Sequence, residues 1–155
     1  MKNHSQAKIE LNEARENGFY EISQAAQISG VSSKMIRYYE SIDLIPPVKR
    51  TFSNYRIYAK SDIQMLSFIK RSRALGFSLE QIRTLLDLWS DERRASADVK
   101  QLVLSHVKEL EEKIVEMQEM SDILRNLATS CCGNQSPECP ILDDLSQISQ
   151  LNLEK

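Results

Sequence analysis

The sequence predicts a mainly α-helical protein, in which a small helical domain precedes one long helix and a C-terminal loop. Apolar residues at helical spacing recur along most of the 155 residues, and only 4 Gly and 4 Pro interrupt them, which argues against a sandwich of many short strands. Hydrophobic residues make up 41% of the chain, enough for a core. Apolar residues that recur at three- and four-residue steps from Val103 to Leu127 predict a long helix over about residues 96–129.

The charges are divided unevenly along the chain. Residues 20–77 hold nine Lys and Arg against four Asp and Glu, a net charge of +5. Residues 78–155 hold eight basic and fifteen acidic residues, a net charge of −7, and residues 1–19 are balanced. The whole-chain charge of −2 conceals this division. The basic segment can attract phosphate groups and the acidic segment cannot.

Nothing in the sequence predicts secretion or a membrane span. No stretch approaches the roughly 20 apolar residues that a span needs. Residues 1–18 are polar and lack the apolar segment of a secretory signal, so we expect a mobile N-terminal extension that holds at most a fraying helix. A cytoplasmic protein without a membrane partner is therefore expected, and its three cysteines are expected to be thiols or metal ligands rather than structural disulfides.

Two helices joined by a tight turn are expected from Tyr20 onward. Gly30 ends the first helix, whose apolar residues are Ile22, Ala25, Ala26 and Ile28. Ser32 or Ser33 can cap the second helix, over about residues 34–41. A helix, a glycine-containing turn and a second helix are typical of a DNA-binding helix-turn-helix.

A hairpin and two more helices are expected next. Pro46 and Pro47 end regular structure, and residues 51–58 favour two short strands with a turn at Ser53-Asn54. A hairpin directly after a helix-turn-helix is a wing. One helix then starts at Ser61 or Asp62 and runs to Leu75, and another runs from a Ser78 cap to about Trp89, with Gln81 at the capping-box position.

The long helix carries an apolar stripe at three- and four-residue steps, like that of a coiled coil. Its candidate dimerisation residues are Val103, Val107, Leu110, Ile114, Met117 and Leu124. A single helix of this length cannot bury such a stripe alone, and the chain offers no second helix of equal length. We expect a homodimer through two copies of this helix. Packing of the stripe on the N-terminal domain is the alternative.

Residues 20–89 resemble the MerR family of transcription regulators. Four motifs carry the resemblance: Ile36-Arg37-Tyr38-Tyr39-Glu40, the link 46–50, Asn54-Tyr55-Arg56-Ile57-Tyr58 and Leu75-Gly76-Phe77-Ser78-Leu79-Glu80-Gln81-Ile82. The resemblance implies a winged helix-turn-helix domain over residues 19–89 that binds double-stranded promoter DNA, with its second helix in the major groove. It implies a linker and dimerisation helix over residues 90–130, paired as an antiparallel coiled coil in the dimer.

Six residues are the candidate DNA contacts: Lys34, Arg37, Tyr39, Arg50, Tyr55 and Arg56. Arg37 can bond guanine edges or phosphate. The residues expected to contact phosphates are Tyr39, Arg50, Tyr55 and Arg56. Lys34 is either a phosphate contact or a solvated lysine, and Tyr38 either meets DNA or packs in the core. Asn54 stands where the family commonly has Gly, and because Asn tolerates a positive φ, the wing turn is expected to survive.

The C-terminal segment 131–155 is expected to hold a metal-binding loop and a short final helix. Cys131 and Cys139 are separated by seven residues, and Cys139-Pro140-Ile141 follows the pattern of the copper-efflux regulators within the MerR family, the CueR-like branch, which the chain resembles. Two thiolates suit a soft monovalent ion, Cu(I), Ag(I) or Au(I), since zinc normally takes more protein ligands. The resemblance also implies that Ser96 marks a monovalent sensor, because divalent and mercury sensors usually have Cys there.

Cys132 departs from the copper-regulator pattern. It is either a third thiolate that broadens the metal range or a bystander that faces solvent. The alternatives to a copper sensor are a sensor of Zn, Cd, Pb or Hg in the same family and a regulator that responds to thiol oxidation or an organic ligand. No nucleophile–base pair, phosphate loop or paired acid site appears, so no enzymatic activity is expected.

The family resemblance implies how such a regulator would act. The dimer would sit on an operator inside an overlong promoter spacer. Metal binding would then bend and untwist the DNA, so that RNA polymerase meets realigned promoter elements at copper efflux genes.

Overall fold

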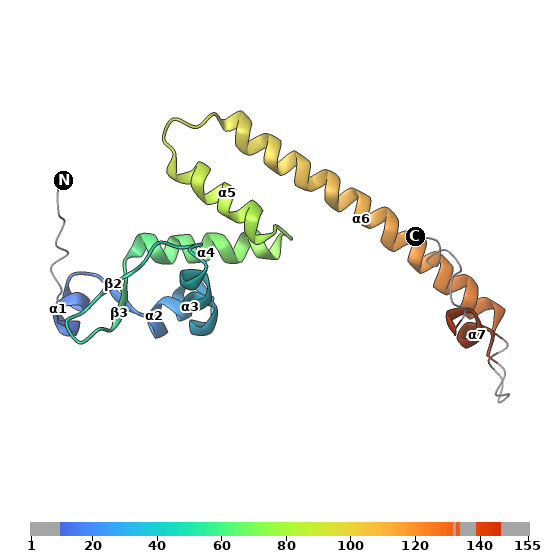
Figure 1. Cartoon of the computed structure of the whole chain (residues 1–155), viewed down its shortest axis with the longest axis horizontal. Coiled ribbons are helices and arrows are strands. Elements are labelled where there is room, and N and C mark those ends of the chain that lie inside the picture. Colours follow the sequence, from blue (N-terminus) through green and yellow to red (C-terminus); the bar gives the residue numbers. More distant parts are fainter. Residues whose placement is uncertain (1–9, 132, 134–138, 147–155) are drawn as a thin grey trace, which may run out of the picture. The chain divides into compact units, whose positions relative to one another are not determined.

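The computed structural model describes residues 10–131, 133 and 139–146 and shows the mainly helical architecture that the sequence predicts (Figure 1). The elements in chain order are α1 Leu11–Glu16, β1 Tyr20–Glu21, α2 Ile22–Ser29, α3 Ser33–Ser41, β2 Lys49–Arg50, β3 Arg56–Tyr58, α4 Lys60–Ala74, α5 Leu79–Ser90, α6 Ser96–Ser130 and α7 Pro140–Ser146. The chain divides into two compact units, residues 1–102 and 103–155. The first unit includes the start of α6, because Val99 and Leu102 pack against its core.

A small antiparallel sheet joins the wing to the N-terminal part of the first unit. Its strand order is β1-β3-β2, and Tyr20 lies opposite Tyr58 while Arg50 lies opposite Arg56. The wing hairpin is therefore present, with its strands at 49–50 and 56–58 rather than within 51–58 alone. β1 was not predicted, because two residues are too few to display the alternation of a strand.

The core of the first unit lies between α2, α3, α4 and α5. α2 contacts both α3 and α4, and α4 contacts α5. Ile36 of α3, Leu66 and Ile69 of α4 and Ile82 of α5 are each fully buried. The predicted cap of α5 is confirmed: the Gln81 N–H donates to Ser78 Oγ at 3.1 Å, and the Ser78 N–H donates to Gln81 Oε1 at 2.8 Å.

Part of the N-terminal segment that we expected to be mobile is folded. Residues 11–16 form α1, and Ala14 is only 1% exposed. Arg15 forms an ion pair with Glu21, and Lys49 Nζ lies 5.1 Å from the centre of the Phe19 ring. The ion pair ties α1 to β1, and the Lys49 contact ties the segment after α1 to β2, so the folded domain begins at residue 11. Residues 1–9 lie outside the described residues.

Beyond residue 102, the structure describes the rest of α6 and α7. The predicted stripe lies on the surface of the single chain: Val103, Val107, Leu110, Ile114, Met117 and Leu124 are between 37% and 60% exposed. His106, in the first half of α6, is buried. The short final helix expected in the C-terminal segment is present as α7, and residues 147–155 lie outside the described residues. Within the part of the chain that is described, no helix is long and apolar enough to cross a membrane.

Candidate nucleic-acid interface and metal loop

The turn between α2 and α3 fixes the direction of α3. Gly30 has a φ of 69°, in the left-handed region, and its N–H donates to the Ala26 carbonyl at 2.8 Å. Ser32 then caps α3, because its Oγ accepts a hydrogen bond from the Met35 N–H at 3.3 Å. Both features were predicted from the sequence, and together they project the outer face of α3 away from the core.

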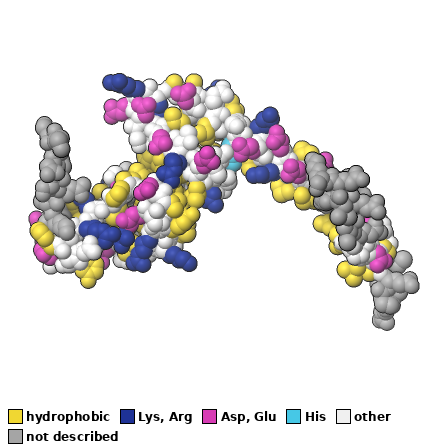
Figure 2. Space-filling view, in the orientation of Figure 1, with side chains coloured by type: hydrophobic (Ala, Val, Ile, Leu, Met, Phe, Trp, Pro, Cys, Tyr) yellow, Lys and Arg dark blue, Asp and Glu magenta, His cyan; other side chains and the backbone are white. Residues whose placement is uncertain are grey.

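The outer face of α3 carries Lys34, Arg37 and Tyr38, all exposed. Figure 2 shows basic side chains gathered on the side of the domain that carries α3. Tyr39 was expected at a phosphate, but it is 6% exposed and belongs to the core, whereas Tyr38 is 45% exposed. The expectation for Tyr39 is therefore corrected: it follows the buried Ile36 by three residues, which puts both side chains on the inward face of the helix.

The wing presents a second set of candidate contacts. Its loop closes through the Thr51 N–H, which donates to the Tyr55 carbonyl at 2.9 Å, and the Asn54 N–H, which donates to the Thr51 carbonyl at 3.0 Å. Asn54 has a φ of 66°, which confirms that Asn supplies the positive φ of this turn. Tyr55, at the end of the loop, is 61% exposed and free to meet a ligand.

Glu40 connects α3 to both wing strands. Its Oε2 accepts a hydrogen bond from Arg56 Nε of β3 at 2.7 Å, and its Oε1 lies 3.9 Å from Arg50 Nη2 of β2. Arg50 Nη1 also donates to the backbone and side-chain oxygens of Asn54, each at 3.3 Å. The two wing arginines are thus held toward α3 rather than free in solvent.

Arg37 lies next to these wing residues. A hollow of about 140 Å³ is lined by residues of β1, α2, α3 and the wing: Glu21, Ile22, Arg37, Asn54, Tyr55 and Arg56. The structure therefore brings three of the candidate DNA contacts, Arg37, Tyr55 and Arg56, to one place, although 18 residues separate the first from the last in the sequence. This cluster has the charge and exposure that a phosphate backbone requires.

Tyr58 lies beneath the same cluster. It is fully buried, and its hydroxyl has no hydrogen-bond partner among the described residues. Burial and, to a smaller extent, the Glu40 carboxylate raise the pKa of Tyr58 from 10.0 to about 12, against the opposing effect of the guanidinium groups of Arg56, Arg37 and Arg50. The hydroxyl therefore stays neutral at physiological pH.

Arg83 is a structural residue of this interface that the sequence did not reveal. From α5 it donates through Nη1 to the Asp43 carbonyl at 2.6 Å and through Nη2 to the Ile42 carbonyl at 2.7 Å. Ile42 is the C-cap of α3, so Arg83 satisfies carbonyl groups where the recognition helix ends. No local pattern could have signalled a contact that spans about 40 residues.

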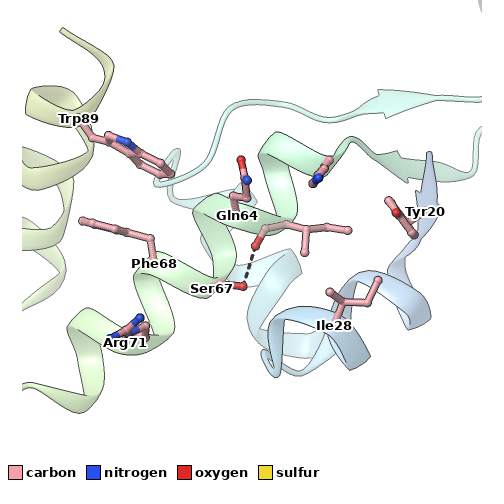
Figure 3. A pocket seen from close by; sticks show the side chains of 9 residues that line it. Tyr20, Ile28, Gln64, Ser67, Phe68, Arg71 and Trp89 are labelled. Carbon is pink, nitrogen blue, oxygen red and sulfur yellow. Dashed lines mark hydrogen bonds between the residues drawn. The ribbon is translucent and has the colours of Figure 1, made fainter. Parts of the chain in front are cut away.

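A separate apolar pocket of about 510 Å³ opens between α2, α4 and α5 (Figure 3). Its wall includes Phe68 and Trp89, whose rings stack with centres 5.1 Å apart, together with Tyr20 and Ile28. Ser67 faces the pocket and donates to the Ile63 carbonyl at 3.0 Å. None of the six candidate DNA contacts lines it.

The metal-loop candidates lie at helix ends. Cys131 directly follows α6, and Cys139 directly precedes α7, where its carbonyl accepts from the Asp143 N–H at 3.0 Å. Both are free thiols and partly buried. Ser96 is the first residue of α6. Cys132 lies outside the described residues, and no group of three or more His, Cys, Asp or Glu side chains that could hold a metal occurs among those that are described.

Family models match most of the chain. A model described as MerR HTH family regulatory protein covers residues 20–89, and one described as MerR, DNA binding covers residues 63–127. The Heavy metal-dependent transcription regulator 2 of Rhizobium meliloti (strain 1021) is 52% identical over 86% of this chain and 91% of its own length. This chain belongs to the MerR family.

Two further relatives carry the names of a particular regulator or metal. The HTH-type transcriptional regulator CueR of Salmonella typhimurium is 43% identical over 81% of this chain and 91% of its own length. The crystal structure of PbrR691 from Ralstonia metallidurans CH34 in complex with lead(II) is 31% identical, with a TM-score of 0.73 over 82% of this chain and 99% of that chain. The chain is thus a heavy-metal-responsive transcription regulator that binds promoter DNA, and its relatives are not enzymes.

Proposed function

We propose that this regulator is a cytoplasmic sensor of Cu(I), and of Ag(I) or Au(I), that binds promoter DNA as a homodimer and activates metal efflux genes. The observation that carries the proposal is the pair of free thiols, Cys131 and Cys139, that bracket the short loop between α6 and α7. Soft thiolates select soft d¹⁰ ions over hard cations. The relative named CueR supports copper, while the relatives named only for heavy metals leave the ion to be tested.

The proposed metal ligands are the thiolates of Cys131 and Cys139. Two sulfurs satisfy a monovalent d¹⁰ ion, and the bound ion would supply a charge and a crosslink between the two helix ends. Ser96 has no thiol to add, which favours a monovalent over a divalent ion.

Dimerisation and DNA contact complete the proposed mechanism. Two copies of α6 would bury the exposed stripe against each other and place two copies of α3 on a twofold-symmetric operator. Lys34, Arg37, Arg50, Tyr55 and Arg56 are the proposed DNA contacts in each copy. Metal binding would shift the dimer toward a state that bends and untwists the promoter for RNA polymerase.

The test is transcription in vitro from the regulator's own promoter with Cu(I), Ag(I), Zn(II) or Hg(II). We expect activation by Cu(I) and Ag(I) in the wild type and no activation in Cys131→Ser or Cys139→Ser, while both variants still bind the promoter. Cys132→Ser is the matched control and should respond like the wild type. Removal of Cu(I) with a competing thiol chelator should return transcription to its basal rate.

A divalent-metal sensor is the second candidate, and two observations favour it. The PbrR691 relative was crystallised with lead(II), and Cys132 offers a third thiol next to Cys131. This candidate predicts tight Zn(II), Pb(II) or Hg(II) binding that Cys132→Ser abolishes. Retention of Zn(II) against a competing chelator by the wild type would therefore replace the copper assignment.

A further inference from the structure

Glu40 is an acidic residue next to the basic side chains of α3 and the wing. It lies on α3, three residues after Arg37, and its side chain is 15% exposed. A carboxylate close to DNA phosphates weakens binding through repulsion, so its place on the recognition helix needs a compensating role. Its contacts with the wing supply one.

The contacts of Glu40 reach two strands at once. Arg56 of β3 donates to one carboxylate oxygen at 2.7 Å, and Arg50 of β2 lies 3.9 Å from the other. Arg50 and Arg56 are cross-strand partners in the sheet, so one carboxylate holds a facing pair of guanidinium groups. Both arginine side chains remain about a third exposed, 34% for Arg50 and 31% for Arg56, which leaves N–H groups for a second acceptor.

We propose that Glu40 is a positioning residue that orients Arg50 and Arg56 for the phosphates of the operator and makes the protein discriminate against other DNA. The proposal rests on the assignment of these arginines as phosphate contacts. A guanidinium that is already paired attracts distant phosphates weakly, which lowers non-specific affinity. Because the guanidinium is already held in one orientation, it loses little side-chain entropy when it binds operator phosphates that match this orientation. Affinity for the operator is therefore preserved.

Neutralisation of Glu40 should therefore change specific and non-specific binding in opposite directions. Glu40→Gln keeps the length of the side chain and an oxygen that can accept from Arg56, but it removes the charge. Affinity for non-specific DNA should rise, with a steeper salt dependence, and affinity for the operator should fall. A loss of wing structure alone would instead lower both affinities.

The experiment uses the full-length protein and two labelled duplexes, one enriched from a random-sequence pool by the wild type and one scrambled duplex of equal composition. Fluorescence anisotropy at several KCl concentrations gives both affinities. We expect the specific-to-scrambled ratio to fall about tenfold in Glu40→Gln, the scale of one charge-assisted contact. Glu80→Gln on α5 changes the net charge equally at an exposed site and should keep the wild-type ratio.

A double-variant cycle tests whether Glu40 acts through Arg56. In an Arg56→Gln background, Glu40→Gln should lower the ratio much less than it does in the wild type. Equal effects in both backgrounds, or a Glu40→Gln ratio equal to that of Glu80→Gln, would overturn the proposal. Arg56→Lys keeps the charge but lacks the Nε donor, so it decides the question if Glu40→Gln does not fold, and an unchanged ratio there also overturns it.

A different result is expected if Arg50 and Arg56 do not contact phosphates at all. If Arg50→Gln and Arg56→Gln bind both duplexes like the wild type with the same salt slope, these arginines do not contact phosphates. If they weaken binding while Glu40→Gln changes nothing, the contacts stand and the positioning role is wrong. Metal response is read separately through transcription, so failure of the copper assignment leaves this test unaffected.

Discussion

The hydroxyl of Tyr58 is buried in the domain and has no hydrogen-bond partner among the described residues. A buried unsatisfied hydroxyl costs on the order of 1–3 kcal/mol. We expect Tyr58→Phe to raise the free energy of unfolding by about 1 kcal/mol in urea titrations at fixed protein concentration. Tyr38→Phe, at an exposed ring, should change nothing, and a destabilised Tyr58→Phe would mean that the hydroxyl is bonded.

The raised pKa of Tyr58 predicts a specific dependence of stability on pH. Between pH 10.0 and about 12, the unfolded chain releases the phenolic proton while the folded chain retains it. The free energy of unfolding therefore does not depend on the ionisation of Tyr58 below pH 10, and it falls as pH rises from 10 toward 12. The stability difference between the wild type and Tyr58→Phe should widen over this window, and a constant difference would contradict the shift.

Arg37 is the exposed arginine at the centre of the recognition helix. We expect Arg37→Ala to weaken operator binding by about 1–3 kcal/mol, the scale of one good base or phosphate contact. Gel-shift titration of the enriched duplex measures the change. Arg93→Ala removes the same charge from the exposed connector between α5 and α6 and is the control. Equal affinities for Arg37→Ala and the wild type would remove Arg37 from the interface.

At the scale of elements, the turn between α2 and α3 depends on a glycine. Gly30 has a positive φ, and an added Cβ would also lie 2.2 Å from Lys70 Nζ. The lysine end can move, whereas the backbone cannot leave the left-handed region without tilting α3. We therefore expect Gly30→Ala to cost about 1–2 kcal/mol of stability, with little recovery in Gly30→Ala/Lys70→Ala. Full recovery in thermal denaturation would show that the steric contact dominates instead.

The elements also show how far local sequence patterns reach. The Gly30 turn, the Ser32 cap and the Ser78 capping box were predicted, because each depends on residues within one helical turn. α1 was expected at most as a fraying helix because residues 11–16 show no apolar period, and the folded helix buries Ala14 and pairs Arg15 with Glu21 of β1. Propensity is weak where packing decides whether a short helix forms.

At the scale of the whole molecule, α6 exposes an apolar stripe along its length (Figure 2). Ile114, near its middle, is 60% exposed in the single chain. If two copies bury this stripe, Ile114→Glu places a charge in the interface and should weaken dimerisation at least about tenfold, because burial of one Ile contributes roughly 1.5–3 kcal/mol. Sedimentation velocity measures the shift toward monomer. Lys113→Glu introduces the same residue one position away and should remain dimeric. A dimeric Ile114→Glu would show that the stripe is not the dimer interface.

The sequence by itself determined the helical architecture, the caps and turn of the helix-turn-helix, the division of charge, and the pairing of Cys131 with Cys139 as candidate ligands. The architecture, the caps and the turn follow from neighbours within a few residues, whereas the pairing of Cys131 with Cys139 rests on the family resemblance and on thiol chemistry and stays a prediction. Only the tertiary structure decided that Tyr39 faces the core while Tyr38 faces solvent, and that Glu40 holds arginines from two strands. Such contacts depend on how elements pack, and no pattern within one element encodes them.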